Sequence, residues 1–290
     1  MFFQQLVTGL SIGGVYALIA TGYSLVYSLL DFSNWAHGEV AMLGAYVAFM
    51  SISALNLPFV AAMVLGIAGA ALISFFNERL AYRRIRHNKS PNMFLMIAAM
   101  GLSTTYQNAA TLIFGAKFKQ FPNVLPISSV NIGNLRIGVL DLVSLIITAV
   151  ILVALIIIIN KTKFGLNVRA IACNSQTADM LGIKVDRCIA MVFLLAGALA
   201  GCAGILLGMK YNVYPTMGNI GVKAFIASVL GGLGSVPGAI VGALLLGVIE
   251  TLASGYLSSG LRDLISFTLL IVILLVRPAG LMGVDVQEKA

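Results

Sequence analysis

Long apolar stretches separated by short polar segments make up nearly the whole chain. Asp, Glu, Lys and Arg are absent from residues 1–30, 40–77, 90–116, 142–160, 188–209 and 224–249. An α-helix needs about 20 largely apolar residues to cross a bilayer. The pattern therefore predicts an all-α, polytopic membrane protein whose residues 1–290 form a single transmembrane domain.

Breaks within the apolar stretches set the expected number of crossings. Residues 40–77 are expected to form two helices joined at Asn56-Leu57-Pro58, because proline disfavours helix at the residue before it. The other expected spans are residues 6–30, 92–114, 142–160, 189–209, 224–249 and 264–276. Together these predict about eight transmembrane helices, or nine if residues 224–249 cross as two pieces.

Residues 231–239, with the sequence GGLGSVPGA, interrupt the stretch 224–249. Gly and Pro at this density break a helix, and broken backbone at membrane depth is tolerated only inside protein or beside a water-filled cavity. One interpretation is a re-entrant turn that the glycines allow to pack closely. In the other, a helix starting near Pro237 points its positive N-terminus at the carboxylate of a solute. The candidate site residues here are Gly231, Gly232, Gly234 and Pro237.

Composition and charge agree with this topology. Of 290 residues, 60% are hydrophobic and 10% are charged, whereas soluble domains carry about a quarter charged residues. Ten of the 18 Lys and Arg residues lie in segments 78–91 and 160–187, which the positive-inside rule assigns to the cytoplasm. The net charge of +8 thus indicates basic cytoplasmic loops and not nucleic-acid binding. Three crossings before segment 78–91 place the N-terminus outside.

Several basic residues fall on the expected outer side, against the usual bias. They are Lys117, Lys119, Arg136, Lys210 and Lys223. Snorkelling at the membrane interface explains such positions, and contact with an acidic protein partner is the alternative.

Small residues recur every four positions in the span 189–209, at Ala196, Ala200, Gly204 and Gly208. Such faces let helix backbones approach closely in lipid. Packing within the chain is one interpretation, and a contact between two copies is the other. No tandem repeat is visible, and a strongly diverged inverted repeat is left open.

A polar segment, NWAHGE at residues 34–39, lies between the first two spans. His37 and Glu39 lack a third metal ligand nearby, since His87 lies in the basic loop, so we expect neither metal nor cofactor. Asn34, His37 and Glu39 are expected to cap a helix start, where an acidic side chain suits the helix dipole. A role beside a translocation pathway is compatible with that interpretation. Glu250, if it lies within the bilayer, requires a cationic partner such as Arg262 or Lys223.

The chain has no phosphate loop of the form GxxxxGK[ST] and few ionisable residues within its spans. Active transport would therefore draw its energy from another subunit. Within the expected cytoplasmic loop 160–187, the spacing Gln176-Thr177-Ala178 followed by Gly182 resembles the E-A-A-x3-G coupling segment of ABC importer permeases. A glycine at this place permits the turn that ends a short helix. A plain amphipathic linker helix is the alternative. The candidate coupling residues are Gln176, Thr177, Ala178, Asp179 and Gly182.

Four segments together resemble one family along nearly the whole chain. They are NWAHGEVAMLGAY (34–46), FGLNVRAIACNSQTADMLGIKVDR (164–187), KAFIASVLGGLGSVPGAIVGALLLG (223–247) and VRPAGLMG (276–283). The family is the LivH-type permease subunit of high-affinity branched-chain amino acid ABC importers. Gln176 and Thr177 depart from its coupling pattern.

The resemblance implies a multi-pass permease of the bacterial cytoplasmic (inner) membrane that moves leucine, isoleucine and valine. It also implies a second permease of the LivM type, two ATP-binding subunits and a periplasmic amino-acid-binding protein, with no nucleic acid. Related permeases carry urea, short amides or other amino acids, so the substrate is left open. A self-sufficient channel or secondary carrier is a further alternative. A membrane enzyme is disfavoured because no catalytic set of residues is clustered.

Overall fold

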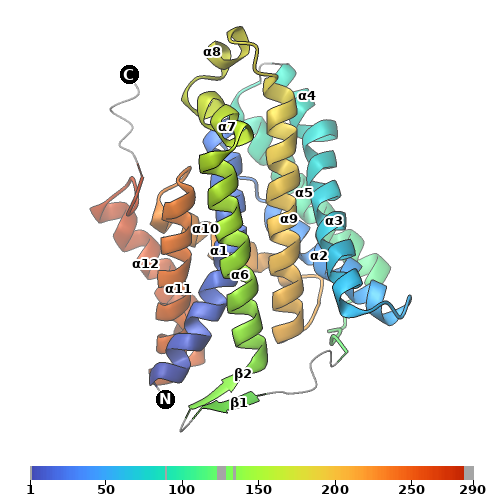
Figure 1. Ribbon diagram of the computed structural model, residues 1–290, viewed down its shortest axis with the longest axis vertical. Coiled ribbons are helices and arrows are strands. Elements are labelled where there is room, and N and C mark those ends of the chain that lie inside the picture. The colour runs from blue at the N-terminus through green and yellow to red at the C-terminus, as the bar shows by residue number, and fades with distance from the viewer. Residues whose placement is uncertain (1, 89, 123–128, 133–134, 284–290) are drawn as a thin grey trace.

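The computed structural model describes residues 2–88, 90–122, 129–132 and 135–283, and nearly all of them are helical (Figure 1). The α-helices are α1 (Phe2–Leu30), α2 (His37–Ser53), α3 (Phe59–Asn77), α4 (Arg83–His87), α5 (Asn92–Phe114), α6 (Val139–Lys161), α7 (Lys163–Cys173), α8 (Ser175–Met180), α9 (Val185–Tyr211), α10 (Ile220–Gly231), α11 (Val236–Tyr256) and α12 (Arg262–Val276). A π-helical turn, Glu78–Tyr82, joins α3 to α4, and 3-10 turns at Met217–Asn219 and Ser259–Leu261 precede α10 and α12. Strands β1 (Ser129–Ile132) and β2 (Leu135–Gly138) form an antiparallel hairpin.

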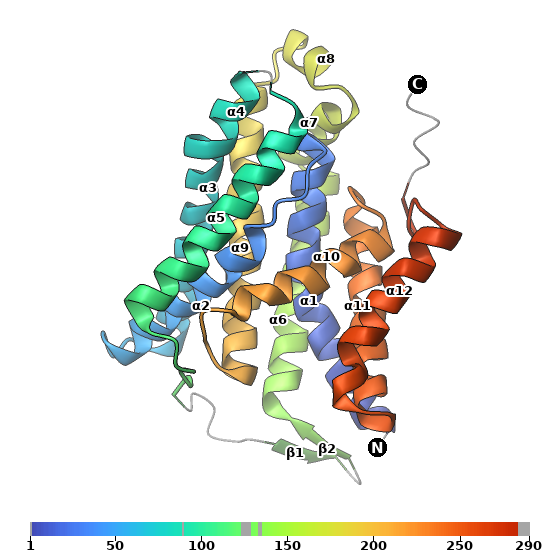
Figure 2. The same cartoon turned by 180° about the vertical axis from the view of Figure 1, so that it is seen from behind.

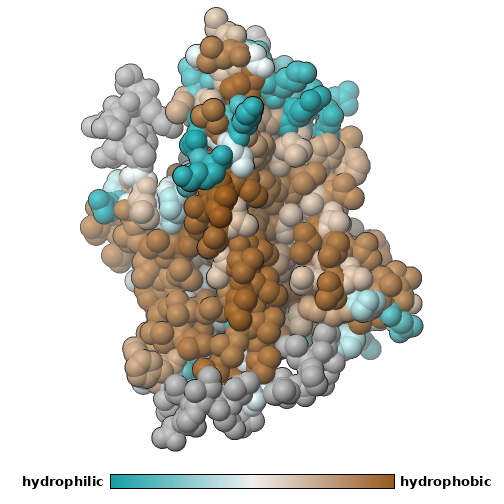
Figure 3. All heavy atoms as spheres, in the orientation of Figure 1, coloured by the Kyte–Doolittle hydropathy of each residue, from teal (hydrophilic) through white to brown (hydrophobic). Residues whose placement is uncertain are grey.

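The long helices lie roughly parallel, with the basic segments at one end of the molecule. Helices α4, α7 and α8 gather at that end, and the N-terminal end of α1 lies at the other, near β1 and β2 (Figure 1). The positive-inside rule makes the α8 end cytoplasmic, so α1 begins on the outer side, as its sequence predicts. Hydrophilic residues gather at the α8 end, and hydrophobic residues cover the flank formed by α6 and α11 (Figure 3).

Six helical segments are long and apolar enough to cross a membrane unaided. They are Phe2–Leu30, Phe59–His87, Val139–Lys161, Val185–Tyr211, Val236–Tyr256 and Ser259–Val276. Helix α5 has 23 residues but is more polar, and α2 and α10 have only 17 and 12 residues. With these three added, the described chain passes between the two ends nine times. Residues 224–249 do form two pieces, α10 and α11, as one alternative predicts, but α10 has only 12 residues and covers part of the membrane depth.

Two halves of the chain share one helix order in opposite directions. Helix α1, a connection, the short helix α2, α3 and α5 correspond to α9, a connection, the short helix α10, α11 and α12. Helices α1 and α9 run antiparallel in the middle of the bundle (Figures 1 and 2). Accordingly α1 packs most extensively on α11, and α9 most extensively on α3. This arrangement is the inverted repeat typical of transporters, which the sequence alone left open.

Close packing of α9 against its neighbours accounts for its small residues. A Cβ atom on Gly197 would lie 2.5 Å from Cβ of Ser74 in α3, and one on Gly204 would meet the carbonyl of Ala41 in α2. Ala196 and Ala200 are fully buried as well. The small-residue face therefore serves packing within the chain, and the alternative of a contact between two copies is wrong for this face.

Candidate functional site: a polar junction between two short helices

The short helix α2 begins inside the protein and not at its surface. It starts at His37 with Glu39 in its first turn, as predicted. Its N-cap is Ala36, and no side chain caps the helix. The expected capping role of Asn34 is wrong, because its side-chain oxygen accepts a hydrogen bond from the Tyr82 hydroxyl at 2.8 Å. Asn34 instead anchors the connection that brings α2 to this depth.

The contacts of His37 show how deep inside the bundle α2 begins. A Cβ atom on Gly22 of α1 would meet its imidazole and would lie 3.5 Å from the carbonyl oxygen of Ala196 in α9. Both neighbours lie well within their helices. His37 is 1% exposed, and its ring makes an edge-on contact with Tyr23, the centroids lying 4.9 Å apart. Neither ring nitrogen makes a hydrogen bond of good geometry among the described residues, although the backbone of Ile19 lies close enough to interact with the ring.

The N-terminal ends of α2 and α10 meet at this point. A Cβ atom on Gly221 would lie 2.8 Å from the Cα atom of Gly38, and one on Gly38 would meet the carbonyl of Gly218. Only glycine leaves room for this approach. Each helix N-terminus carries a partial positive charge, so bringing two together is unfavourable without a nearby anion.

Glu39 supplies a carboxylate at the junction. Its side chain contacts Gly218 so closely that a Cβ atom there would collide with it. Glu39 is 3% exposed, and the Ser103 hydroxyl of α5 lies 3.5 Å from its Oε1, the limit for a hydrogen bond. Its Oε2 has no partner in the described chain. The junction thus combines two helix N-termini, an acidic side chain and a histidine in a buried place.

Glu250 of α11 is a second buried carboxylate, and both of its oxygens accept hydrogen bonds. Its Oε2 accepts from the Tyr16 hydroxyl at 3.1 Å, and its Oε1 accepts from Ser266 at 2.5 Å. The Lys223 ammonium lies 3.2 Å from Glu250 and 2.7 Å from Asp263. Of the two cations expected as partners, Lys223 is therefore the one that pairs.

The expected snorkelling of the outer lysines is wrong for two of them. Lys223 is held in the cluster with Glu250, and Lys210 pairs with Asp141 at 2.5 Å. Both lysines are mostly buried because a carboxylate within the chain neutralises each of them.

The segment 231–239 forms a tight turn between α10 and α11. Gly232 and Gly234 adopt positive φ angles of 111° and 84°, and a Cβ atom on Gly231 would meet the carbonyl of Gly238. The N–H of Gly238 donates to the Ser235 hydroxyl, which caps α11. The serine cap and the close glycine contacts favour the interpretation of a closely packed turn. A solute-facing helix start near Pro237 stays a prediction. The helices that start inside the bundle are α2 and α10.

Polar residues on α5 escaped the sequence analysis. Thr104, Thr105, Asn108 and Thr111 are all exposed on one side of this helix. On its inner side, the Tyr106 hydroxyl donates to Asn77 of α3, and Ser103 faces Glu39. Helix α5 therefore links the junction to an exposed polar stripe at membrane depth. The available signal was a charge-free span with six Ser, Thr, Asn and Gln residues between 103 and 111.

The predicted coupling segment forms a short helix at the cytoplasmic tip. Asn174 caps α8 by accepting from the Thr177 N–H at 3.0 Å. Gly182, with φ of 85°, ends it, and the N–H of Ile183 donates to the carbonyl of Ala178 at 3.1 Å. This is the Schellman arrangement, so the prediction that Gly182 ends a short helix is confirmed. Ala178 is buried, whereas Met180 and Leu181 are 87% and 77% exposed.

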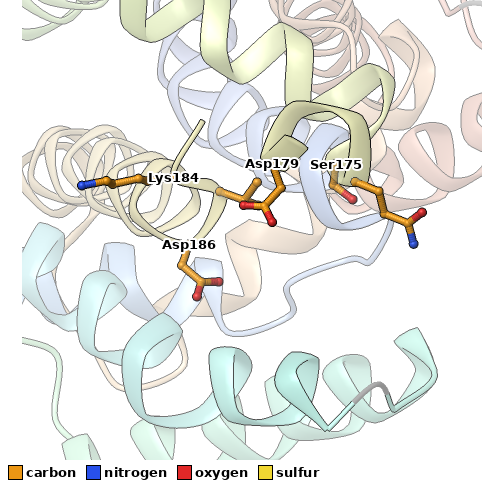
Figure 4. Close-up of a pocket in the computed structure, with 6 residues that line it drawn as sticks. Ser175, Asp179, Lys184 and Asp186 are labelled. Carbon is orange, nitrogen blue, oxygen red and sulfur yellow. The ribbon is translucent and has the colours of Figure 1, made fainter. Parts of the chain in front are cut away.

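An open pocket of about 400 Å³ lies beneath α8 (Figure 4). Its lining comprises Ser175, Gln176, Asp179, Lys184, Val185 and Asp186. Asp186 also pairs with Arg83 at 2.9 Å, Arg86 at 2.5 Å and His87 at 2.8 Å. These ion pairs tie the start of α9, directly behind α8, to the end of the long helix that contains α3.

Comparison with known proteins shows the family to which the chain belongs. Residues 5–274 match the family model described as branched-chain amino acid transport system / permease component. The chain belongs to this permease family. It is 40% identical to the high-affinity branched-chain amino acid transport system permease protein LivH of Salmonella typhimurium, over 99% of this chain and 97% of the relative. It is 38% identical to BraD of Pseudomonas aeruginosa over 99% and 98% of the two chains, and 31% identical to a probable LivH of Methanocaldococcus jannaschii over 92% and 88%.

A solved structure shares the fold of this family member. PsaBC from Streptococcus pneumoniae, in complex with Fab, superposes with a TM-score of 0.50 at 14% identity, over 95% of this chain and 91% of that chain. The similarity supports the helical membrane fold only. The roles of individual residues follow from their contacts.

Proposed function

We propose that the chain is the permease subunit of an ABC importer that moves branched-chain amino acids across the cytoplasmic membrane. The observation that carries the proposal is the identity of 38% or more, over nearly the full length, to permeases named for this transport. Separate ATPase subunits supply the energy, since the chain contains no phosphate loop. A binding protein delivers the substrate from the outer side.

Reconstitution tests this function. Proteoliposomes with the complete complex should take up leucine with ATP inside, and omission of the ATPase should abolish uptake. Flux through the chain alone would instead establish the channel or carrier alternative. Competition by isoleucine and valine, but not by urea or acetamide, separates the substrate classes.

Helix α5 is proposed to face the translocation pathway and a second permease, of the LivM type. Exposed Thr and Asn side chains at membrane depth are unfavourable against lipid, and a neighbouring subunit or a water-filled pathway satisfies them. The hydroxyls of Thr104, Thr105 and Thr111 each donate to a carbonyl one turn back. Their lone pairs and the Asn108 side-chain oxygen are then free to accept hydrogen bonds from a passing ammonium group.

The junction of Asn34, His37 and Glu39 is proposed to act as the hinge beside this pathway. It is buried here, so transport would require α2 and α10 to separate. Its unpaired polar atoms favour such motion, because separation costs few hydrogen bonds and lets water reach His37 and Glu39. Glu250, by contrast, is proposed to hold α10 against α11 and α12.

Helix α8 is proposed to seat in the ATPase subunit, with Met180 and Leu181 as the apolar contact. Exposure above three quarters at two adjacent large apolar residues is unusual at a polar end of the molecule. Met180→Asp should abolish stimulation of the ATPase, and Met180→Leu should retain it. If Met180→Asp couples normally in an assembled complex, the docking role is wrong. Ala178 is a poorer test site because it is buried and a larger side chain would disturb α8 itself.

A further inference from the structure

A polar pocket opens at the outer end of the bundle, away from the junction and the coupling segment. It has a volume of about 320 Å³. Its lining residues come from the N-terminal turns of α1, the end of α9, the last turns of α11 and the start of α12: Gln4, Gln5, Thr8, Ile12, Tyr211, Thr251, Ser254, Gly255 and Arg262. Most of them can donate hydrogen bonds, and only one, Arg262, is charged.

The charge of Arg262 is not neutralised by the described chain. The carboxylates nearest in the sequence or the structure already have lysine partners: Glu250 and Asp263 pair with Lys223, and Asp141 pairs with Lys210. No carboxylate of the described residues lies within ion-pair distance of Arg262, and its Nε is buried without a hydrogen-bond partner. A partly desolvated guanidinium without an anion is unfavourable.

A second polar atom in the pocket is also unpaired. Oε1 of Gln5 is buried and has no partner among the described residues. Because it is an acceptor, this oxygen can pair with a hydroxyl or ammonium group of a ligand and not with the oxyanion itself. A Cβ atom on Gly255 would collide with the Gln5 amide, so the absence of a side chain at position 255 keeps this wall of the pocket free.

The chemistry of the lining selects an oxyanion. A guanidinium presents a planar fork of N–H donors that matches the two oxygens of a carboxylate or phosphate. Two lining hydroxyls are already used, since Thr8 donates to Asp141 and Thr251 donates to the carbonyl of Gly247. The further donors of the lining are the amides of Gln4 and Gln5 and the hydroxyls of Tyr211 and Ser254. Exposed apolar residues adjoin the lining residues Gln4 and Gly255 in the sequence, with Phe2 49%, Phe3 66%, Tyr256 61% and Leu257 69% exposed. An apolar rim at the outer membrane interface suits the acyl chains of a lipid.

We propose that this pocket binds one oxyanion through Arg262, either the phosphate of an anionic phospholipid headgroup or the carboxylate of a small zwitterion. The lipid source fits the apolar rim best. The site is separate from the proposed pathway on α5, and its occupation by lipid does not depend on which solute the complex transports.

Binding to the purified permease complex in detergent tests the proposal in two arms. Native mass spectrometry with phosphatidylglycerol measures the lipid arm, and calorimetric titration with leucine measures the carboxylate arm. Arg262→Gln should weaken binding in at least one arm by roughly ten- to a hundredfold, the worth of a charge-assisted hydrogen bond. Arg277→Gln removes one positive charge at the exposed C-terminal end of α12 and should leave binding unchanged.

A second variant distinguishes loss of the guanidinium from misfolding caused by Arg262→Gln. Gly255→Leu retains the guanidinium but fills the pocket beside Gln5, and it should lose binding to a similar extent while the complex stays assembled on size exclusion. The proposal is overturned if neither ligand binds, or if the bound amount is the same in Arg262→Gln, Gly255→Leu and the unaltered complex. Loss in the lipid arm alone identifies a lipid site, and loss in the leucine arm alone identifies a carboxylate site.

Discussion

Helices α5 and α12 hold equivalent places in the two halves of the molecule, and they differ in what they expose. On α12 the exposed positions are largely apolar, with Leu264 62%, Ile271 57% and Leu275 79% exposed. On α5 the outer half exposes Thr104, Thr105 and Asn108, beside the apolar Leu112 and Ile113 at its end, which are 86% and 73% exposed. The two helices thus occupy equivalent backbone positions in the repeat, but their exposed side chains differ in polarity. An apolar α12 suits lipid or an apolar neighbour, whereas the Thr and Asn stripe of α5 favours a polar neighbour.

The short helices α2 and α10 differ in how their charged and polar side chains are paired. Lys223 of α10 pairs with Glu250 and Asp263, so the second half is held together by charges. Helix α2 has no such pair, and Glu39 and His37 retain unpaired atoms. The structure therefore combines a short helix α10 that is held by ion pairs with a short helix α2 whose His37 and Glu39 side chains are only weakly bonded. We infer that motion during transport is concentrated around α2 and α5.

The largest expected effect comes from a matched pair of tryptophan substitutions. Thr105→Trp on α5 should lower leucine uptake at least about tenfold, because it fills the polar face with a bulky apolar ring, and a barrier increase of about 1.4 kcal/mol suffices for that loss. Thr268→Trp, also at an exposed threonine but on α12, should leave uptake within about twofold. Uptake by the reconstituted complex is the measurement. Equal losses from both would erase the functional distinction between the two helices.

The charged second half offers the next test. Lys223→Met leaves Glu250 buried without its cation and should lower the free energy of unfolding by about 3 kcal/mol. The double variant with Glu250→Gln should recover most of this loss, since no uncompensated charge is left. Unfolding in detergent, followed by circular dichroism, measures both. A single variant as stable as the unaltered protein would contradict the role of this pair in holding α10.

The sequence predicted the elements whose signals are local. Pro58 separated α2 from α3, Gly182 ended α8, and the basic loops gave the orientation, because each depends on a few neighbouring residues. The errors concern contacts between distant segments. Lys223 looked like an outer snorkelling residue until α11 and α12 brought Glu250 and Asp263 beside it. The meeting of Gly38 with Gly221 and the exposed stripe on α5 depend on how the two halves pack, which no local pattern records.

Glycine substitutions compare the buried junction with the exposed stripe. Gly38→Ala should cost about 1–3 kcal/mol of stability, because its methyl group meets the backbone of Gly218 and Gly221. Gly101→Ala on α5 meets nothing within 4 Å and should stabilise the helix by up to about 1 kcal/mol. The midpoints of thermal unfolding should move in opposite directions. A common direction for both variants would mean that the junction is looser than its contacts imply.

Cysteine labelling, which has the smallest expected effect on the protein, tests whether water reaches the exposed faces of α5 and α12. In a background with the exposed Cys173 replaced by serine, Asn108→Cys on α5 and Ile271→Cys on α12 each place one thiol at an exposed position within the membrane. A charged thiosulfonate reagent reacts with thiolates that water can reach, so Asn108→Cys in the complex should be labelled and Ile271→Cys should not. Leucine should slow labelling at position 108 if the solute passes there. Protection by the second permease without any effect of leucine would assign the stripe to subunit contact alone, and labelling of Ile271→Cys as fast as Asn108→Cys would show that polarity does not distinguish the two faces.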